Sequence, residues 1–316
     1  MHLVSAAGIM PARVEQTAIY VRRETRPAWD SCWGREEAMG EDKGAGVRYL
    51  FGHSEEETRR LLQQGRLFNP YTRRLLEDAG IERGMKVLDV GSGAGDVALL
   101  AAELVGPGGA VVGVDSNPQI LETARGRARS AGFENISFVA TDVGRLALDE
   151  DFDAVVGRCV LFFVSDPAAV LRRLAGHLRP GGIVAFQEPG NATLRPDALP
   201  PSPLLDRMWG WVMETYERAG MDLKMGLRLF PLFSEAGLPV PRMRLDAAVG
   251  GGPEWEGYGY MASMLRTLCP LIVRFGVATA EEVGVDTFEE RLREEIVSRG
   301  GVVTTWSFVT ASARLS

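Results

Sequence analysis

Short apolar runs alternate with longer segments of mixed polarity through the middle of the chain. The longer segments carry helix start and stop signals, such as Asn117-Pro118 before one segment and Gly132 after it. Nearly continuous apolar strands separated by helices are typical of a parallel sheet covered on both faces. The pattern therefore predicts a doubly wound α/β core. Its strands are expected at residues 85–90, 110–114, 136–140, 152–156 and 183–187.

Two further helices are expected ahead of this core. Ser54 and Glu57 have the spacing of a capping box, which predicts the start of a first helix. Asn69 followed by Pro70 predicts the start of a second helix. Gly80 is a suitable residue to end that helix, because glycine readily adopts the left-handed conformation found there.

The two ends of the chain differ from the core. Segment 22–46 is rich in charged residues and glycine, so residues 1–46 are expected to form a flexible N-terminal arm. Residues 47–190 would hold the N-terminal helices and the core. Residues 191–316 would form helical cap insertions plus the last two strands of the core. In this last region helices are expected at about 203–219, 226–236 and 254–298, and strands at 242–249 and 301–313.

The composition argues against several classes of function. The 316 residues have a net charge of −7, so no basic field favours nucleic acid or an anionic membrane as a partner. The three cysteines and three histidines are too scattered for a disulfide framework or a metal site. The chain has no apolar run near the roughly 18 residues of a membrane span. We therefore expect a cytoplasmic protein that binds no metal.

A glycine-rich turn, GSGAG at residues 91–95, follows the first expected strand. Ligands of open α/β sheets bind beyond the carboxyl ends of the strands, and glycines there allow a ligand to touch the backbone. A dinucleotide fingerprint would need glycine at position 96, where this chain has Asp96. A carboxylate on the first turn of the helix would repel phosphate. The turn thus disfavours a diphosphate and favours a ligand that carries positive charge.

Two more acids follow the next two strands. Asp115 ends the second strand, where an acid can accept both hydroxyls of a ribose. Asp142 follows the third strand and could accept the amino group of an adenine, with the Val143 amide facing the ring. A ribose, an adenine and a cationic group without phosphate together describe S-adenosylmethionine.

Residues 85–190 resemble the class I S-adenosylmethionine-dependent methyltransferases, in the broad group that includes the ubiquinone and menaquinone biosynthesis type. The matching motifs are LDVGSGAG, VVGVDSNP, FVATDV and FDAVVGRCVLFFVSDPAAVLRRLAGHLRPGGIVAFQEP. Four motifs in this order and spacing are specific, whereas one alone would be weak. The resemblance implies a Rossmann-like, seven-stranded sheet whose last strand is antiparallel, and we expect that strand at 301–313.

The resemblance also implies which residues hold the cofactor. Ser116 would lie beside Asp115 at the ribose, and Val143 would join Asp142 at the adenine. Arg158, at the end of the fourth strand, would line the methionine or substrate side. The residues expected to face the methionine part are Asp89, Gly91, Ser92, Gly93 and Gly95.

Candidates for a catalytic base are fewer. Methyl transfer from a sulfonium depends mainly on alignment, so a general base is optional. His53, just before the first helix, could remove a proton, although a role at the helix entry explains it as well. Glu188, at the carboxyl end of the fifth strand, is a candidate on the substrate side, and a solvated loop acid is an equal explanation. Aromatic residues and methionines of the C-terminal region could line an apolar pocket or only pack the cap.

These observations predict an S-adenosylmethionine-dependent methyltransferase that transfers a methyl group to a small, apolar or aromatic molecule by direct displacement. Two alternatives stay open. One is a regulatory module that binds the cofactor without turnover, and the other is a nucleotide-dependent oxidoreductase, which Asp96 disfavours. The sequence leaves the acceptor atom and the oligomeric state open, and the N-terminal arm could contact a neighbouring subunit of a homo-oligomer.

Overall fold

The computed structural model describes residues 49–51, 54–146, 148, 151–190 and 194–316. All of these residues belong to one compact unit, Lys43–Ser316. The predicted flexible arm, residues 1–46, and the candidate base His53 lie outside the described residues.

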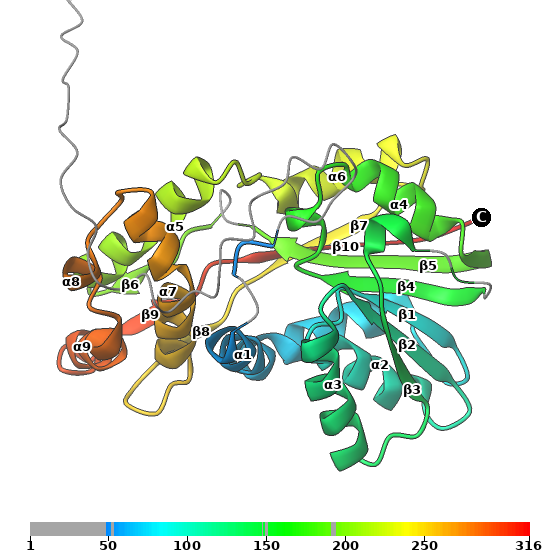
Figure 1. Cartoon of the computed structure of the whole chain (residues 1–316), viewed down its shortest axis with the longest axis horizontal. Coiled ribbons are helices and arrows are strands. Elements are labelled where there is room, and N and C mark those ends of the chain that lie inside the picture. The colour runs from blue at the N-terminus through cyan, green and yellow to red at the C-terminus, as the bar shows by residue number, and fades with distance from the viewer. Residues whose placement is uncertain (1–48, 52–53, 147, 149–150, 191–193) are drawn as a thin grey trace, which may run out of the picture. The chain divides into compact units, whose positions relative to one another are not determined.

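A seven-stranded sheet forms the centre of this unit (Figure 1), with the strand order β3-β2-β1-β4-β5-β10-β7. The first five strands of this order pair in parallel, and β10 is antiparallel to both of its neighbours. The prediction of a doubly wound, Rossmann-like sheet with an antiparallel last strand is confirmed. The strands are β1 (Lys86–Val90), β2 (Ala110–Asp115), β3 (Ile136–Ala140), β4 (Phe152–Arg158), β5 (Leu178–Pro189), β7 (Arg242–Asp246) and β10 (Phe308–Arg314).

Helices cover both faces of the sheet, because successive residues of a strand point to opposite sides. On one face Val87 packs in a cluster with α2 (Asp96–Val105) and α3 (Pro118–Ser130). On the other face Leu88 packs in a cluster with α4 (Pro167–Ala175) and α6 (Met225–Glu235). Figure 1 shows α2 and α3 on the opposite side of the sheet from α4 and α6.

A helical cap is inserted in the sequence between β5 and β10 of the core sheet. Its helices are α5 (Pro203–Arg218), α7 (Gly257–Arg274), α8 (Ala280–Val283) and α9 (Val285–Val297). A small sheet with the order β6-β9-β8 joins them, built from β6 (Ala198–Leu199), β9 (Val302–Thr304) and β8 (Val249–Gly251). No helix of the described part of the chain is long and apolar enough to cross a membrane.

Two predicted strands are each divided between the two sheets, which the sequence did not indicate. The predicted strand 242–249 becomes β7 in the core and the start of β8 in the cap. The predicted strand 301–313 becomes β9 in the cap and β10 in the core. Where the chain passes between the sheets, the Thr305 amide donates to the Ala248 carbonyl, 2.8 Å away. The two chain segments therefore leave the core sheet side by side, at Ala248 and Thr305.

α1 (Glu55–Ala79) is one helix of 25 residues, so the prediction of two helices is wrong. The two ends were predicted correctly: Ser54 Oγ accepts from the Glu57 amide at 3.2 Å, and Gly80 is left-handed with φ 89°. Pro70 lies within the helix. The helix continues through Pro70 because the contacts of α1 with α2, β5 and α7 offset the main-chain hydrogen bond lost at the proline and the clash of its ring.

Candidate active site

A cavity of about 320 Å³ lies where the glycine turn, α1 and the cap meet. Its two ends differ in chemistry. The polar end is lined by Gly91, Ser92, Gly93, Asp115, Ser116 and Val143. The aromatic end is lined by Phe51, Phe162, Tyr216, Tyr260, Trp306 and Phe308.

The glycine turn has a backbone that other residues would strain. Gly91, Gly93 and Gly95 all have positive φ, at 63°, 52° and 86°. Gly91 also lies tightly against the end of β4, where an added Cβ would come 2.5 Å from a methyl group of Val160. The turn therefore presents main chain to the cavity.

Asp115 lines the cavity and also holds the turn in place. Its Oδ2 accepts from the Gly93 amide and its Oδ1 from the Asn117 amide, both at 2.9 Å. The same carboxylate thus connects the ends of β1 and β2. Hydrogen bonds between an ionised carboxylate and backbone amides are strong, so this contact orders the turn.

Asp89 lies outside the lining of the cavity. It is fully buried, and neither carboxylate oxygen has a hydrogen-bond partner among the described residues. Burial raises the pKa of Asp89 to about 7, although Ser92 and the charge of Arg158 oppose this shift. Asp89 therefore lies under the turn as a buried acid.

Asp142, predicted to lie at the adenine, is not among the described residues that line the cavity. Its Oδ1 accepts from the Gly144 amide at 2.6 Å and caps η1 (Val143–Arg145). Thr141 and Val143, on either side of it, line the cavity. This part of the site is therefore formed by the neighbours of Asp142.

Asp96 lines the cavity, but its charge is compensated. Its Oδ1 pairs with Arg127 at 2.8 Å, and its Oδ2 pairs with Arg158 at 3.5 Å. Two guanidinium groups therefore already compensate the charge of the Asp96 carboxylate within the protein. α1 packs closely here, since a Cβ on Gly65 would come 2.4 Å from Asp96 Oδ1.

Arg158 lies at the end of β4 and in the wall of the cavity. Its Nη1 donates to Asn69 Oδ1 at 3.0 Å and to Thr72 Oγ1 at 3.1 Å. These bonds to α1, with the ion pair to Asp96, fix the guanidinium between α1 and the start of α2.

A buried polar network on α1 was missed by the sequence analysis. Arg60 donates two hydrogen bonds of 2.6 Å to Glu57 and one of 2.6 Å to Gln64. Tyr49 donates to the same Glu57 carboxylate. Burial lowers the pKa of Arg60, but the charge and the hydrogen bonds of Glu57, with smaller contributions from Tyr49 and Tyr260, together hold that pKa above its ordinary value. The spacing of Glu57, Arg60 and Gln64 on one helix face was the available signal.

Cys159 is a further residue of the site that the sequence analysis did not single out. It follows β4 with φ 56°, a left-handed conformation that is unusual outside glycine. It lines the cavity, and Gln64 Nε2 lies 3.7 Å from its sulfur. Burial raises the pKa of the Cys159 thiol to about 12, so the thiol is protonated at neutral pH.

The prediction that Glu188 faces the substrate side is wrong. Glu188 is fully buried, and its carboxylate accepts from the amides of Val160, Leu161 and Phe162 at 2.9, 2.9 and 3.1 Å. Burial raises the pKa of Glu188 to about 7, while these three hydrogen bonds lower it. The acid therefore anchors the main chain of η2 (Leu161–Phe163), and it is not among the described residues that line the cavity.

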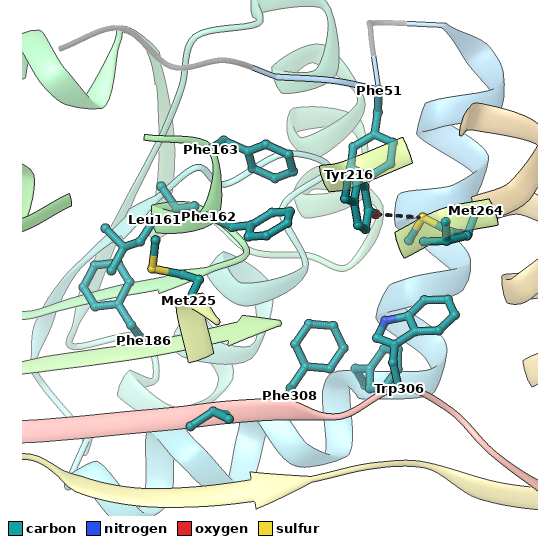
Figure 2. Close-up of a cluster of buried hydrophobic side chains, with 14 of the residues drawn as sticks. Phe51, Leu161, Phe162, Phe163, Phe186, Tyr216, Met225, Met264, Trp306 and Phe308 are labelled. Carbon is teal, nitrogen blue, oxygen red and sulfur yellow. Dashed lines mark hydrogen bonds between the residues drawn. The ribbon is translucent and has the colours of Figure 1, made fainter. Parts of the chain in front are cut away.

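Aromatic rings from distant parts of the chain form the other end of the cavity. Figure 2 shows Phe162 and Tyr216 facing Trp306 and Phe308. The Phe162 and Tyr216 rings meet edge to face with centroids 5.6 Å apart. Trp306 stacks on Trp209 at 5.8 Å with an interplanar angle of 19°. The prediction left open whether such residues line a pocket, and these residues do.

Seven of the ten predicted cofactor residues line this cavity. They are Gly91, Ser92, Gly93, Asp115, Ser116, Val143 and Arg158. The other three lie just behind the wall: Asp89 is under the turn, Asp142 caps η1, and Gly95 begins α2. The motifs therefore lie around the polar end of the cavity.

Known proteins with similar sequences and folds are methyltransferases by their names. Residues 81–216 match the family model of the methyltransferase domain. An arsenite methyltransferase from Halobacterium salinarum is 36% identical over 129 residues, which are 38% of this chain and 33% of that protein. A ubiquinone/menaquinone biosynthesis C-methyltransferase from Idiomarina loihiensis is 36% identical over 134 residues, which are 41% of this chain and 52% of that protein. The chain thus spans a third to a half of the length of these relatives.

A solved structure matches a larger part of the chain. It is a candidate methyltransferase from Bacillus halodurans C-125, with a TM-score of 0.51 and 19% identity, and the match covers 77% of this chain and 97% of that one. At this identity the match shows the fold. The family model agrees with the resemblance noted in the sequence: residues 81–216 match a methyltransferase domain, and the sheet has the fold of this solved structure.

Proposed function

We propose that the protein transfers a methyl group from S-adenosylmethionine to a small, apolar or aromatic molecule by direct displacement. The observation that carries this proposal is one continuous cavity with two chemically different ends. The glycine turn and Asp115 lie at one end, and a wall of aromatic rings lies at the other.

The residues at the polar end fit this cofactor. The turn offers bare main chain, and Gly93 itself lines the cavity. Asp115 would accept the ribose hydroxyls, with Ser116 beside it. Thr141 and Val143 would lie at the adenine, and the cofactor supplies a methyl group activated by a positively charged sulfur.

The residues of the chain contribute alignment and exclusion of water. A displacement reaction needs the nucleophile and the methyl group in line, and orientation can supply several kcal/mol of the barrier reduction, roughly 7–11 kcal/mol at most. The aromatic end can hold an acceptor against the polar end. Arg158 and Cys159, where β4 ends, also line the cavity.

A small molecule is the acceptor that the chain favours. The net charge of −7 gives no general attraction for nucleic acid. Cys159 and Cys269 are free thiols, which suit the reducing conditions of the cytoplasm. The relatives named above act on different acceptors by their names, so the acceptor of this chain follows from its own cavity.

Calorimetric titration with S-adenosylmethionine, S-adenosylhomocysteine and NAD tests the cofactor. We expect binding of the first two in the micromolar range and none of NAD. Asp115→Ala removes a charged acceptor and loosens the turn, so affinity should fall ten- to a hundredfold, as expected for a loss of about 1.5–3 kcal/mol. Glu134→Ala, at an exposed acid on the surface, is the control and should bind as the wild type does.

Absence of binding to a folded sample would overturn the proposal. Transfer of label from methyl-labelled S-adenosylmethionine to pools of small aromatic molecules then tests turnover. Cofactor binding without transfer to any pool would favour the alternative of a regulatory module.

A further inference from the structure

Tyr260 carries a buried hydroxyl that the fold itself does not use. It lies on α7, is 1% exposed, and lines the aromatic end of the cavity. Its ring packs against Phe68 at 5.4 Å and Trp306 at 5.0 Å between centroids. Its oxygen has no hydrogen-bond partner among the described residues. A buried polar group without a partner costs about 1–3 kcal/mol, so such a group needs an explanation.

The hydroxyl is a neutral donor under ordinary conditions. Burial raises the pKa of Tyr260 above its usual value, while the charge of Arg60 opposes this shift. The group therefore stays protonated and offers one O–H donor together with acceptor lone pairs.

Charges near this hydroxyl are already compensated. Arg60 is 4% exposed and Glu57 is 3% exposed, and the two form a bidentate pair that also involves Gln64 and Tyr49. A ligand with its own charge would enter this low-dielectric space without a free counter-charge, which is costly. The aromatic end thus favours an uncharged ligand.

The walls around Tyr260 favour a flat ligand. Trp306 lies between Tyr260 and the stacked Trp209, and Phe308 lies beside Trp306 in Figure 2. Across from them, Phe162 and Tyr216 present their rings. Aromatic rings are attracted to one another in stacked and edge-to-face arrangements, beyond the burial of their area.

We propose that Tyr260 determines the specificity of the acceptor site: its hydroxyl holds one oxygen of an uncharged, planar aromatic molecule. This inference rests on the proposed function, because it assigns the second ligand of the same cavity. Tyr260 acts here by positioning the acceptor, and the oxygen it holds fixes how the ring is turned towards the polar end.

Tyr258 provides a matched control two residues away. It is fully buried, and its hydroxyl also has no partner among the described residues. It differs from Tyr260 in its surroundings, since its ring meets Trp255 at 5.0 Å and Arg293 at 5.7 Å, and it is not among the described residues that line the cavity. Tyrosine to phenylalanine at either position removes one buried, unpartnered hydroxyl, but only Tyr260 lines the cavity.

Equilibrium dialysis with 2-naphthol and naphthalene, in the presence of saturating S-adenosylhomocysteine, tests the proposal. We expect the wild type to bind 2-naphthol about five- to tenfold more tightly than naphthalene, the size of one neutral hydrogen bond. Tyr260→Phe should bring this ratio close to one, and Tyr258→Phe should keep it. A purely structural role for Tyr260 would change the affinity for both probes alike and leave the ratio unchanged.

The other outcomes are equally distinct. The same ratio in the wild type and in Tyr260→Phe overturns the proposal, as does a wild type that binds neither probe while it holds S-adenosylhomocysteine. Tighter binding of 2-naphthoate than of 2-naphthol would overturn the assignment of an uncharged ligand. Failure to bind S-adenosylhomocysteine at all would instead overturn the proposed function.

Discussion

The two ends of the cavity are built in different ways. Residues close together in sequence, in the turn at 91–95 and at the ends of β2 and β3, form the polar end. The aromatic end gathers side chains from η2, α5, α7 and the region around the start of β10. Under the proposed function, the turn's main chain and the Asp115 carboxylate would meet the cofactor at one end, and aromatic side chains would meet the acceptor at the other. A local motif can therefore specify the first end, whereas the second depends on the whole fold.

The first prediction concerns the acid under the polar end. The pKa of Asp89 is about 7 in the folded protein and 3.8 ordinarily. A raised pKa means that the folded state binds the proton more tightly, so this contribution to stability is complete below pH 4 and is lost as the pH rises to about 7. Asp89→Asn has no such loss. Its free energy of unfolding relative to the wild type should rise by on the order of 4 kcal/mol between pH 4 and pH 8, at about 1.4 kcal/mol per pKa unit.

Urea unfolding of the wild type and Asp89→Asn at several pH values gives this difference directly. Asn is close in shape to protonated Asp, so the two proteins should be nearly equal in stability at pH 4. A difference that does not change with pH would show that Asp89 is ionised in the folded protein throughout this range.

The second prediction separates the two ends. Trp306→Leu removes a ring that faces the aromatic end, and the affinity for 2-naphthol should fall about tenfold because a stacking partner and apolar area are lost. The affinity for S-adenosylhomocysteine should stay within about threefold of the wild type, a change of less than about 0.7 kcal/mol. Equilibrium dialysis with each ligand measures both values.

Trp255→Leu is the matched control, since Trp255 packs on Tyr258 away from this cavity. It should leave both affinities unchanged. If Trp306→Leu weakened the binding of both ligands equally, the two ends of the cavity would not be independent binding sites.

The third and smallest prediction lies within the polar end. Asp142→Ser keeps an oxygen that can cap η1, but the shorter side chain cannot reach a ligand. We expect calorimetry to show an affinity for S-adenosylhomocysteine within about threefold of the wild type, since serine and aspartate are similar caps. A tenfold loss, comparable to that expected for Asp115→Ala, would instead assign the Asp142 carboxylate to the adenine as the sequence first suggested.

The sheet and the polar end could be predicted because their signals are local. Apolar runs predicted five core strands, and the glycines of the turn occupy left-handed positions that few other residues adopt. Asp115 was recognisable because the acid ends a strand and stands at a fixed spacing after the turn. In each case the physical requirement applies to residues that are close together in sequence.

The failures have the opposite cause. Pro70 looks like a helix start when only its neighbours are considered, yet contacts with α2, β5 and α7 keep α1 continuous. Glu188 looks like an exposed acid at a strand end, yet three amides from residues 160–162 surround it. Tyr260 could not be distinguished from Tyr258 in the sequence. Only the packing of the whole fold decides which of the two rings meets the cavity.

The anchoring of η2 by Glu188 has a consequence for the choice of acceptor. Three main-chain amides of the wall that carries Phe162 and Phe163 are tied to one buried carboxylate. Moving this wall outwards would leave the carboxylate and the amides without partners in the interior, which is expensive. This side of the cavity is therefore rigid. We expect it to exclude acceptors larger than the cavity, because only rotations of the Phe162 and Phe163 rings could make room for them.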